Sequence, residues 1–140
     1  MKKIFVVDDD MFSLLKFKQQ LVNQSFYDIT LFTNAADCLL QLDEKPDLIL
    51  IDYRMEGMDG LTLLKKVKQV HPGIYVVFVV QQNNLLAAVK SLQGGAFDYV
   101  IKGPNESKRL ENIIKNIRRT DETFRAFNAK AKKNYFSVDY

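Results

Sequence analysis

Residues 47–52 read DLILID, a run of four large apolar side chains with an aspartate at each end. A short run that is apolar at every position, rather than at every second one, is typical of a strand buried on both faces of a parallel sheet. The sequence therefore predicts a central strand over residues 48–51, with Asp52 at its carboxyl end.

Two other runs, residues 4–7 and residues 74–80, are continuously apolar in the same way. Two more apolar runs, residues 29–32 and residues 97–101, complete a predicted set of five strands. Strands that are buried on both faces need helices on both sides of the sheet. We therefore expect helices in the segments between the runs.

These segments carry apolar residues at helical spacing. The predicted inward-facing residues are Met11, Leu14, Phe17 and Leu21; Cys38, Leu39 and Leu42; Leu61, Leu64, Val67 and Val70; Leu85, Ala88, Val89 and Leu92; and Leu110, Ile113, Ile114 and Ile117. Asn34 and Asp37 have the spacing of an N-cap and its third-position carboxylate, Gly94 and Gly95 are a helix stop, and Asn105 opens the last helix. Strands alternating with helices predict a three-layer, doubly wound α/β fold around a parallel sheet.

The length and composition limit the class of protein. A chain of 140 residues can form one hydrophobic core but is too short for two ordinary domains. The sequence contains no apolar run near the roughly 20 residues that a membrane-spanning helix needs, and its start is unlike a signal peptide. The single cysteine, Cys38, is predicted to be a small buried side chain and fits a reducing compartment. We expect a cytoplasmic protein that does not contact a membrane.

The apolar pattern thins after Arg119, so we predict a domain over residues 1–119 and a C-terminal tail over residues 120–140. Because Phe124 and Phe127 continue the last helical stripe, the tail is interpreted as a linker to a further domain, a dimerising helix or a frayed end. Residues 102–140 hold 10 Lys or Arg against 5 Asp or Glu, but the charges are interleaved with other residues. We expect an exposed surface and no direct DNA binding, since about 20 residues are too few for a DNA-binding domain.

Charged residues follow three of the predicted strands. Asp8, Asp9 and Asp10 come directly after the first strand, Asp52 ends the third, and Lys102 ends the fifth. The carboxyl ends of parallel strands lie at one edge of the sheet, where converging carboxylates repel one another unless a cation compensates. Oxygen ligands with high negative charge suit Mg²⁺. A metal, a lysine and a nucleophilic aspartate are what phosphoryl transfer to a carboxylate requires. Asp10 alone has a second interpretation, as the N-cap of the first helix.

The order and spacing of three stretches, residues 5–10, 47–60 and 95–102, resemble the receiver domain of bacterial two-component response regulators. The resemblance covers residues 1 to about 119. It implies a flavodoxin-like sheet with strand order 2-1-3-4-5. It also implies a phosphoprotein that takes a phosphoryl group from a histidine kinase or a phosphotransfer protein. A downstream protein would then bind the face formed by the fourth helix, fifth strand and fifth helix.

Position by position, the resemblance assigns a role to each strand-end residue. Asp52 is the expected phosphoacceptor and a Mg²⁺ ligand. Asp9 is expected to ligate Mg²⁺ directly, Asp8 through water, and Arg54 through its backbone carbonyl. Lys102 is expected to bind the phosphoryl oxygens.

The sequence departs from the family at three positions. Val80 stands where the family has a Ser or Thr whose hydroxyl binds the phosphoryl group; Gln81 or Gln82 are candidate substitutes. Gly103 stands where proline usually follows the lysine, so we expect a rebuilt loop without a cis peptide. Glu56 stands where proline is common, so it adds a carboxylate beside the site.

Tyr99 falls where the family has an aromatic residue whose rotation reports phosphorylation, and a partly buried strand tyrosine is the alternative. The residues leave three functions open. The first is a working receiver, and the second is a pseudo-receiver that binds partners without phosphorylation because of Val80. The third, an enzyme or nucleotide-binding protein, is disfavoured because aspartates rather than a glycine-rich loop follow the first strand.

His71 is interpreted as a surface helix cap. We expect no conventional enzyme, although self-phosphorylation from a small donor and self-dephosphorylation are compatible with the site.

Overall fold

The computed structural model describes residues 1–136 and contains one parallel sheet. Its strands are β1 (Lys3–Val7), β2 (Asp28–Phe32), β3 (Leu48–Asp52), β4 (Tyr75–Val80) and β5 (Asp98–Ile101). Every neighbouring pair is parallel, and the order across the sheet is β2-β1-β3-β4-β5. The predicted strand positions and strand order are confirmed.

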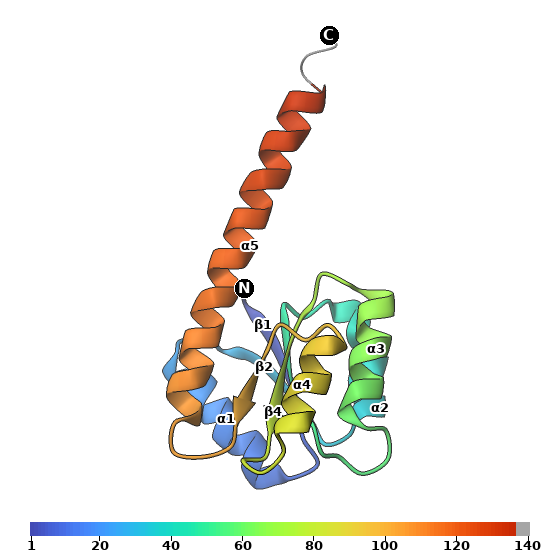
Figure 1. Cartoon of the computed structure of the whole chain (residues 1–140), viewed down its shortest axis with the longest axis vertical. Coiled ribbons are helices and arrows are strands. Elements are labelled where there is room, and N and C mark those ends of the chain that lie inside the picture. Colours follow the sequence, from blue (N-terminus) through green and yellow to red (C-terminus); the bar gives the residue numbers. More distant parts are fainter. Residues whose placement is uncertain (137–140) are drawn as a thin grey trace.

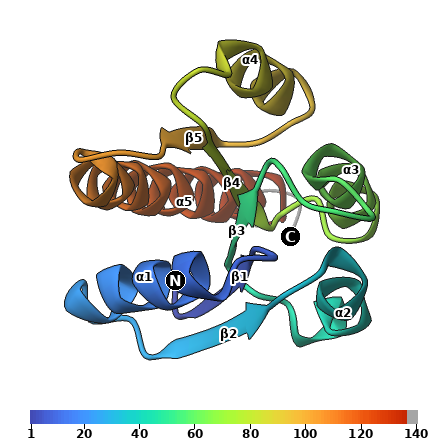
Figure 2. The same cartoon turned by 90° about the horizontal axis from the view of Figure 1, so that it is seen from below.

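Helices cover both faces of the sheet (Figure 2). They are α1 (Met11–Asn23), α2 (Ala35–Leu40), the 3₁₀ turn η1 (Leu42–Glu44), α3 (Gly60–Val70), α4 (Leu85–Gln93) and α5 (Glu106–Phe136). Helices α1 and α5 pack on one face, while α2, α3 and α4 pack on the other. The three-layer, doubly wound architecture is therefore confirmed.

The two faces of the central strand explain why its sequence is apolar throughout. Successive side chains of a strand point to opposite faces. Leu48 and Leu50 of β3 belong to the core beneath α1 and α5, and Ile49 and Ile51 belong to the core beneath α2, α3 and α4. All five residues of β3 are buried. The strand has no solvated face, so no polar side chain interrupts it before Asp52.

The predicted inward stripes hold for most helices but not for α4. The four predicted residues of α5, from Leu110 to Ile117, are all buried, whereas Met11 and Val70 at the ends of their stripes are exposed. In α4 the prediction is confirmed only for Ala88, because Ala87, Ala88 and Ser91 face the sheet. These small side chains let the helix lie close to the sheet, and the Ser91 hydroxyl donates to the Ala87 carbonyl at 2.7 Å. The larger residues of α4 remain exposed: Leu85, Leu86, Val89 and Leu92.

Local hydrogen bonds fix where the helices begin. The Asn34 side chain accepts from the Asp37 N–H at 2.8 Å, as predicted. Asp10 accepts from the Phe12 N–H at 3.1 Å, which confirms the N-cap interpretation of that residue. Gly95 follows α4 with a positive φ of 104°, so the predicted stop has the left-handed geometry that glycine tolerates best.

Helix α5 continues past the end of the sheet (Figure 1). Tyr75, the first residue of β4, donates from its hydroxyl to Asp121 at 3.3 Å, and beyond this contact Phe124 and Phe127 are exposed. Residues 120–136 of the predicted tail are helical, and residues 137–140 lie outside the described residues. Within residues 1–136, none of the helices is long and apolar enough to cross a membrane.

Gly60, the first residue of α3, lies close against the sheet. A Cβ there would be 2.6 Å from Cε1 of the buried Phe78 and 3.1 Å from the Asp52 carbonyl oxygen. We predict that Gly60→Ala lowers the free energy of unfolding by about 1 to 3 kcal/mol, because neither neighbour can move freely. Urea denaturation measures the change. Gly73→Ala is the control, since a Cβ at Gly73 has no neighbour within 4 Å; equal losses in both variants would contradict the packing argument.

Candidate functional site

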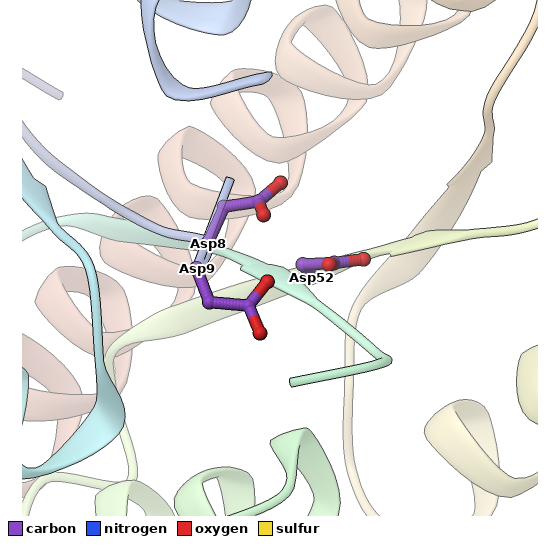
Figure 3. Close-up of side chains that lie close together, drawn as sticks. All are labelled: Asp8, Asp9 and Asp52. Carbon is purple, nitrogen blue, oxygen red and sulfur yellow. The ribbon is translucent and has the colours of Figure 1, made fainter. Parts of the chain in front are cut away.

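Three aspartates meet at the carboxyl edge of the sheet (Figure 3). Asp52 is the last residue of β3, and Asp8 and Asp9 directly follow β1, the strand paired with β3. Asp8 and Asp52 are only 2% and 5% exposed, whereas Asp9 is exposed. One carboxylate oxygen from each of the three residues lies within 4.8 Å of the others. The predicted convergence of these residues is therefore present.

The oxygens of this cluster, Asp8, Asp9 and Asp52, are only partly satisfied by the protein. Oδ1 of Asp8 accepts from the Asp10 N–H at 2.9 Å, and Oδ2 of Asp9 accepts from the Glu56 N–H at 3.1 Å. Oδ2 of Asp8 is buried without a hydrogen-bond partner. A buried carboxylate oxygen without a partner is costly, and a divalent cation with a preference for oxygen ligands would satisfy it. The donor set therefore fits Mg²⁺.

The pKa values report the same electrostatic strain. The pKa of Asp8 is raised to about 6: burial is the largest cause, the nearby charges of Asp52 and Asp9 add to it, and the Asp10 N–H and Lys102 oppose it. Burial also raises the pKa of Asp52 above its ordinary value, and this rise is opposed by Lys102 and by a hydrogen bond from the Arg54 N–H. Both shifts favour the protonated form more than in an exposed aspartate, so a bound cation would compete with protons.

Lys102 places a positive charge beside Asp52. Its Nζ lies 3.6 Å from Oδ1 of Asp52, and its backbone N–H donates to the Val80 carbonyl at 2.9 Å, which fixes it to the end of β4. A separation of 3.6 Å is longer than a direct hydrogen bond. The ammonium group therefore lowers the cost of the Asp52 charge without being locked against it.

The loop after Lys102 has a conformation that depends on glycine. Gly103 has a φ of 154°, and a Cβ at this position would lie 2.6 Å from Nε2 of Gln82. Its N–H, which a proline would lack, donates to Oε2 of Glu106 at 3.2 Å. The positive φ of Gly103 is the kind of unusual dihedral expected from the sequence, and residues 1–136 contain no cis peptide bond.

Val80, the last residue of β4, is 1% exposed and belongs to the core beneath α2, α3 and α4. Its side chain supplies no hydroxyl at the strand end. Gln82, one of the two proposed substitutes, is exposed, and its amide lies against Gly103. Tyr99 is half-buried, with the Arg109 guanidinium 5.7 Å from its ring, and Arg109 also binds Asp98 at 2.7 Å.

Other sequence-based interpretations concern residues outside the cluster. Cys38 is buried, as predicted, and burial raises the pKa of its thiol to about 12. His71 is the C-cap residue of α3, which agrees with its interpretation as a helix cap. Glu106 was not identified from the sequence, although it is buried next to the lysine loop. Its partners Lys16 and Gln20 lie on α1, and no local pattern signals a pairing over that distance in the chain.

These features define a doubly wound α/β protein with a carboxylate cluster and a lysine at the strand ends. A family model described as the response regulator receiver domain matches residues 4–115. The chain belongs to this family.

Curated relatives agree with that assignment. The DNA-binding transcriptional regulator NtrC of Escherichia coli K12 is 43% identical over 100 residues, a match that covers 71% of this chain and 21% of the relative. The transcriptional regulatory protein ZraR of Salmonella typhimurium is 36% identical over 121 residues, covering 86% of this chain and 27% of the relative. The chain thus spans about a fifth to a quarter of the length of these relatives.

Solved structures agree as well. NtrX from Brucella abortus superposes with a TM-score of 0.86 at 26% identity, covering 96% of this chain and 30% of that one. A receiver domain protein from Clostridium thermocellum has a TM-score of 0.80 at 23% identity, covering 89% of this chain and 99% of that one, and shows the shared fold.

The raised pKa of Asp8 predicts how pH and Mg²⁺ act on stability. An aspartate whose folded-state pKa is raised from 3.8 to about 6 does not lower the free energy of unfolding when it is protonated in both states. It lowers that free energy progressively as pH rises through this range. We predict that Asp8→Asn raises the free energy of unfolding at pH 7.5 without Mg²⁺ by about 1 to 3 kcal/mol. The gain should shrink towards pH 4, and millimolar Mg²⁺ should stabilise the parent more than the variant.

Denaturation at several pH values, with and without Mg²⁺, measures both effects. Asp28→Asn is the control, because it makes the same change at an exposed aspartate on β2. An Asp8→Asn variant that behaves like this control would contradict the electrostatic account of the site.

Proposed function

We propose that this receiver accepts a phosphoryl group on Asp52 from a histidine kinase or a phosphotransfer protein, in a Mg²⁺-dependent reaction, and signals by a conformational change. One observation carries the proposal. A buried carboxylate, Asp52, has an ammonium group 3.6 Å away and two further carboxylates within 4.8 Å. This arrangement offers a nucleophile, a cation for the phosphoryl oxygens and a metal site in one place.

In the proposed reaction an Asp52 carboxylate oxygen attacks phosphorus. The new O–P bond forms as the bond to the donor atom breaks, and that electron pair leaves with the donor. Lys102 neutralises charge on the phosphoryl oxygens. Asp8 and Asp9, together with the Arg54 carbonyl, would hold Mg²⁺, which when bound offsets the charge shared by phosphate and carboxylates. Attack of water on the phosphorus would break the O–P bond, release inorganic phosphate and return the Asp52 carboxylate, so we propose a switch with self-dephosphorylation rather than a conventional enzyme.

Exposed apolar residues beside the site support a protein donor. Met11, Phe12 and Leu15 on α1 are exposed, and α1 begins directly after the Asp8–Asp10 segment. A donor that covers these residues would bring its phosphoryl group to the edge of the sheet where Asp52 lies. Exposed apolar side chains that gather on one surface favour a protein partner.

The output surface we propose is the face of α4, β5 and α5. The exposed apolar residues of α4 support it, since a downstream protein could bury them. Added charge at Asp52 would draw Lys102 inward, and Lys102 directly follows β5. Tyr99 on β5, held beside Arg109, is the proposed reporter of this shift.

Other properties remain proposals from the sequence. We assign no DNA-binding role to residues 1–136, and the DNA-binding function in the name of NtrC belongs to that longer relative. A homodimer through α5 agrees with the exposure of Phe124 and Phe127. A cytoplasmic location stays a prediction.

A pseudo-receiver is the second candidate function. The observation that favours it is Val80, whose buried side chain cannot bind a phosphoryl oxygen. A lost hydrogen bond to a charged group costs about 1.5 to 3 kcal/mol, which weakens the link between phosphate and conformation. The nucleophile and the metal ligands are unaffected, so we favour a working receiver with a small conformational shift.

Intact-mass spectrometry after incubation with Mg²⁺ and acetyl phosphate tests the proposed function. We expect one added phosphoryl group in the parent, and none in Asp52→Asn, because the amide cannot form the acyl phosphate. Asp59→Asn makes the same change at an aspartate that caps α3, where Asp59 accepts from the Thr62 N–H at 2.8 Å. This control should gain a phosphoryl group as the parent does. No addition to a folded parent that binds Mg²⁺ would favour the pseudo-receiver.

Restoring a hydroxyl at position 80 tests the limit on switching. We predict that Val80→Thr lowers the stability of the unphosphorylated protein by about 1 to 2 kcal/mol, because a buried hydroxyl loses its water. Acetyl phosphate and Mg²⁺ should then stabilise this variant more than the parent in thermal denaturation. Val79→Thr places the same hydroxyl in the core beneath α1 and α5 and should show the loss alone. Equal responses to acetyl phosphate in both variants would count against a role for position 80.

A further inference from the structure

Glu106 is a buried carboxylate outside the aspartate cluster. It is the first residue of α5 and is 7% exposed. Its Oε1 accepts from Lys16 Nζ at 2.8 Å and from Gln20 Nε2 at 3.1 Å, both on α1, and its Oε2 accepts from the Gly103 N–H at 3.2 Å. Burial alone would raise the pKa of Glu106, but these contacts lower it below its ordinary value. The side chain is therefore a charged junction between α1, α5 and the loop after β5.

The position of this junction relative to Lys102 is specific. The Lys102 N–H donates to the Val80 carbonyl at 2.9 Å, and the next N–H along the chain, that of Gly103, donates to Glu106. These two hydrogen bonds hold the backbone on both sides of the Lys102 Cα. Gly103 has a φ of 154° and no side chain to pack. Without these hydrogen bonds its backbone could adopt many other conformations.

The reach of a lysine depends on where its backbone is held, because its four-carbon side chain is flexible. Lys102 Nζ stands 3.6 Å from Asp52, so a small backbone shift changes the charge that faces this carboxylate. Lys16, the cation that fixes Glu106, lies on the helix that begins directly after Asp10. Glu106 thus connects the loop that carries the lysine to the helix that follows the acidic loop.

We propose that Glu106 is a positioning residue for Lys102, which holds the ammonium group at the distance from Asp52 that phosphoryl transfer needs. This inference rests on the proposed function of Asp52 for its effect on rate. The placement of Lys102 is a separate physical claim that can be measured without any phosphodonor.

The test compares Glu106→Gln with Glu111→Gln. Glu111 lies on the same helix, its side chain is 40% exposed, and it pairs with Lys115 at 3.2 Å and with Lys108 at 4.0 Å. With saturating Mg²⁺ and acetyl phosphate, we expect phosphorylation of Glu106→Gln to slow by about 10-fold, as for a misplaced reacting group. Phosphorylation of Glu111→Gln should be unchanged. The Kd for Mg²⁺ should stay within about twofold in both variants, because neither residue belongs to the aspartate cluster.

A second readout uses no phosphodonor. Nuclear magnetic resonance order parameters of the Lys102 backbone N–H and of its Cε should fall in Glu106→Gln and not in Glu111→Gln. Lys16→Gln is a milder variant for the case in which Glu106→Gln does not fold, since the Lys16 side chain is 43% exposed. It should shift both readouts in the same direction by a smaller amount.

Unchanged Lys102 order in the folded Glu106 or Lys16 variant would overturn the inference, and so would a slower rate explained entirely by weaker Mg²⁺ binding. A parent that takes no phosphoryl group would instead contradict the proposed function. In that case the order parameters would still decide whether Glu106 positions the lysine.

Discussion

The repulsion between Asp8, Asp9 and Asp52 is the constraint on which the rest of the site depends. Two of these carboxylates are buried, and a parallel sheet with β1 beside β3 brings them together. Charges in such a place need compensation, and the protein supplies part of it through Lys102 and backbone N–H groups. The remainder, seen in the unpaired Oδ2 of Asp8, suits a divalent cation. The uncompensated charge is the feature on which the proposed binding of a cation depends.

Much of this could be predicted from the sequence because the informative signals are local. A strand buried on both faces shows itself as an unbroken apolar run, and the residue that ends the run lies at a defined edge of the sheet. Asp8, Asp52 and Lys102 could therefore be placed together without coordinates. The inward face of α4 was predicted correctly only at Ala88, because apolar side chains occur all around this helix and periodicity alone does not say which side packs.

The missed features are pairings between distant parts of the chain. Glu106 and Lys16 come from different helices, and the bond from the Glu56 N–H to Asp9 joins two loops. A carboxylate in the first turn of a helix is common, because the helix dipole favours it there, so Glu106 carried no distinctive signal. Gly103 could be identified as unusual from the sequence, but not the partner of its N–H. Such partners depend on how elements pack.

The length of α5 has a mechanical consequence. The helix has 31 residues, about 46 Å at the usual rise per residue, and its last core residue is Ile117. The Tyr75 hydroxyl still holds the helix at Asp121, so the stretch from Asp121 to Phe136 is a lever arm of about 22 Å with its fulcrum at that contact. A tilt of about 5° at the fulcrum would sweep the far end through about 2 Å, by the geometry of a straight helix. A change too small to alter the packing of the core could therefore be amplified at the tip.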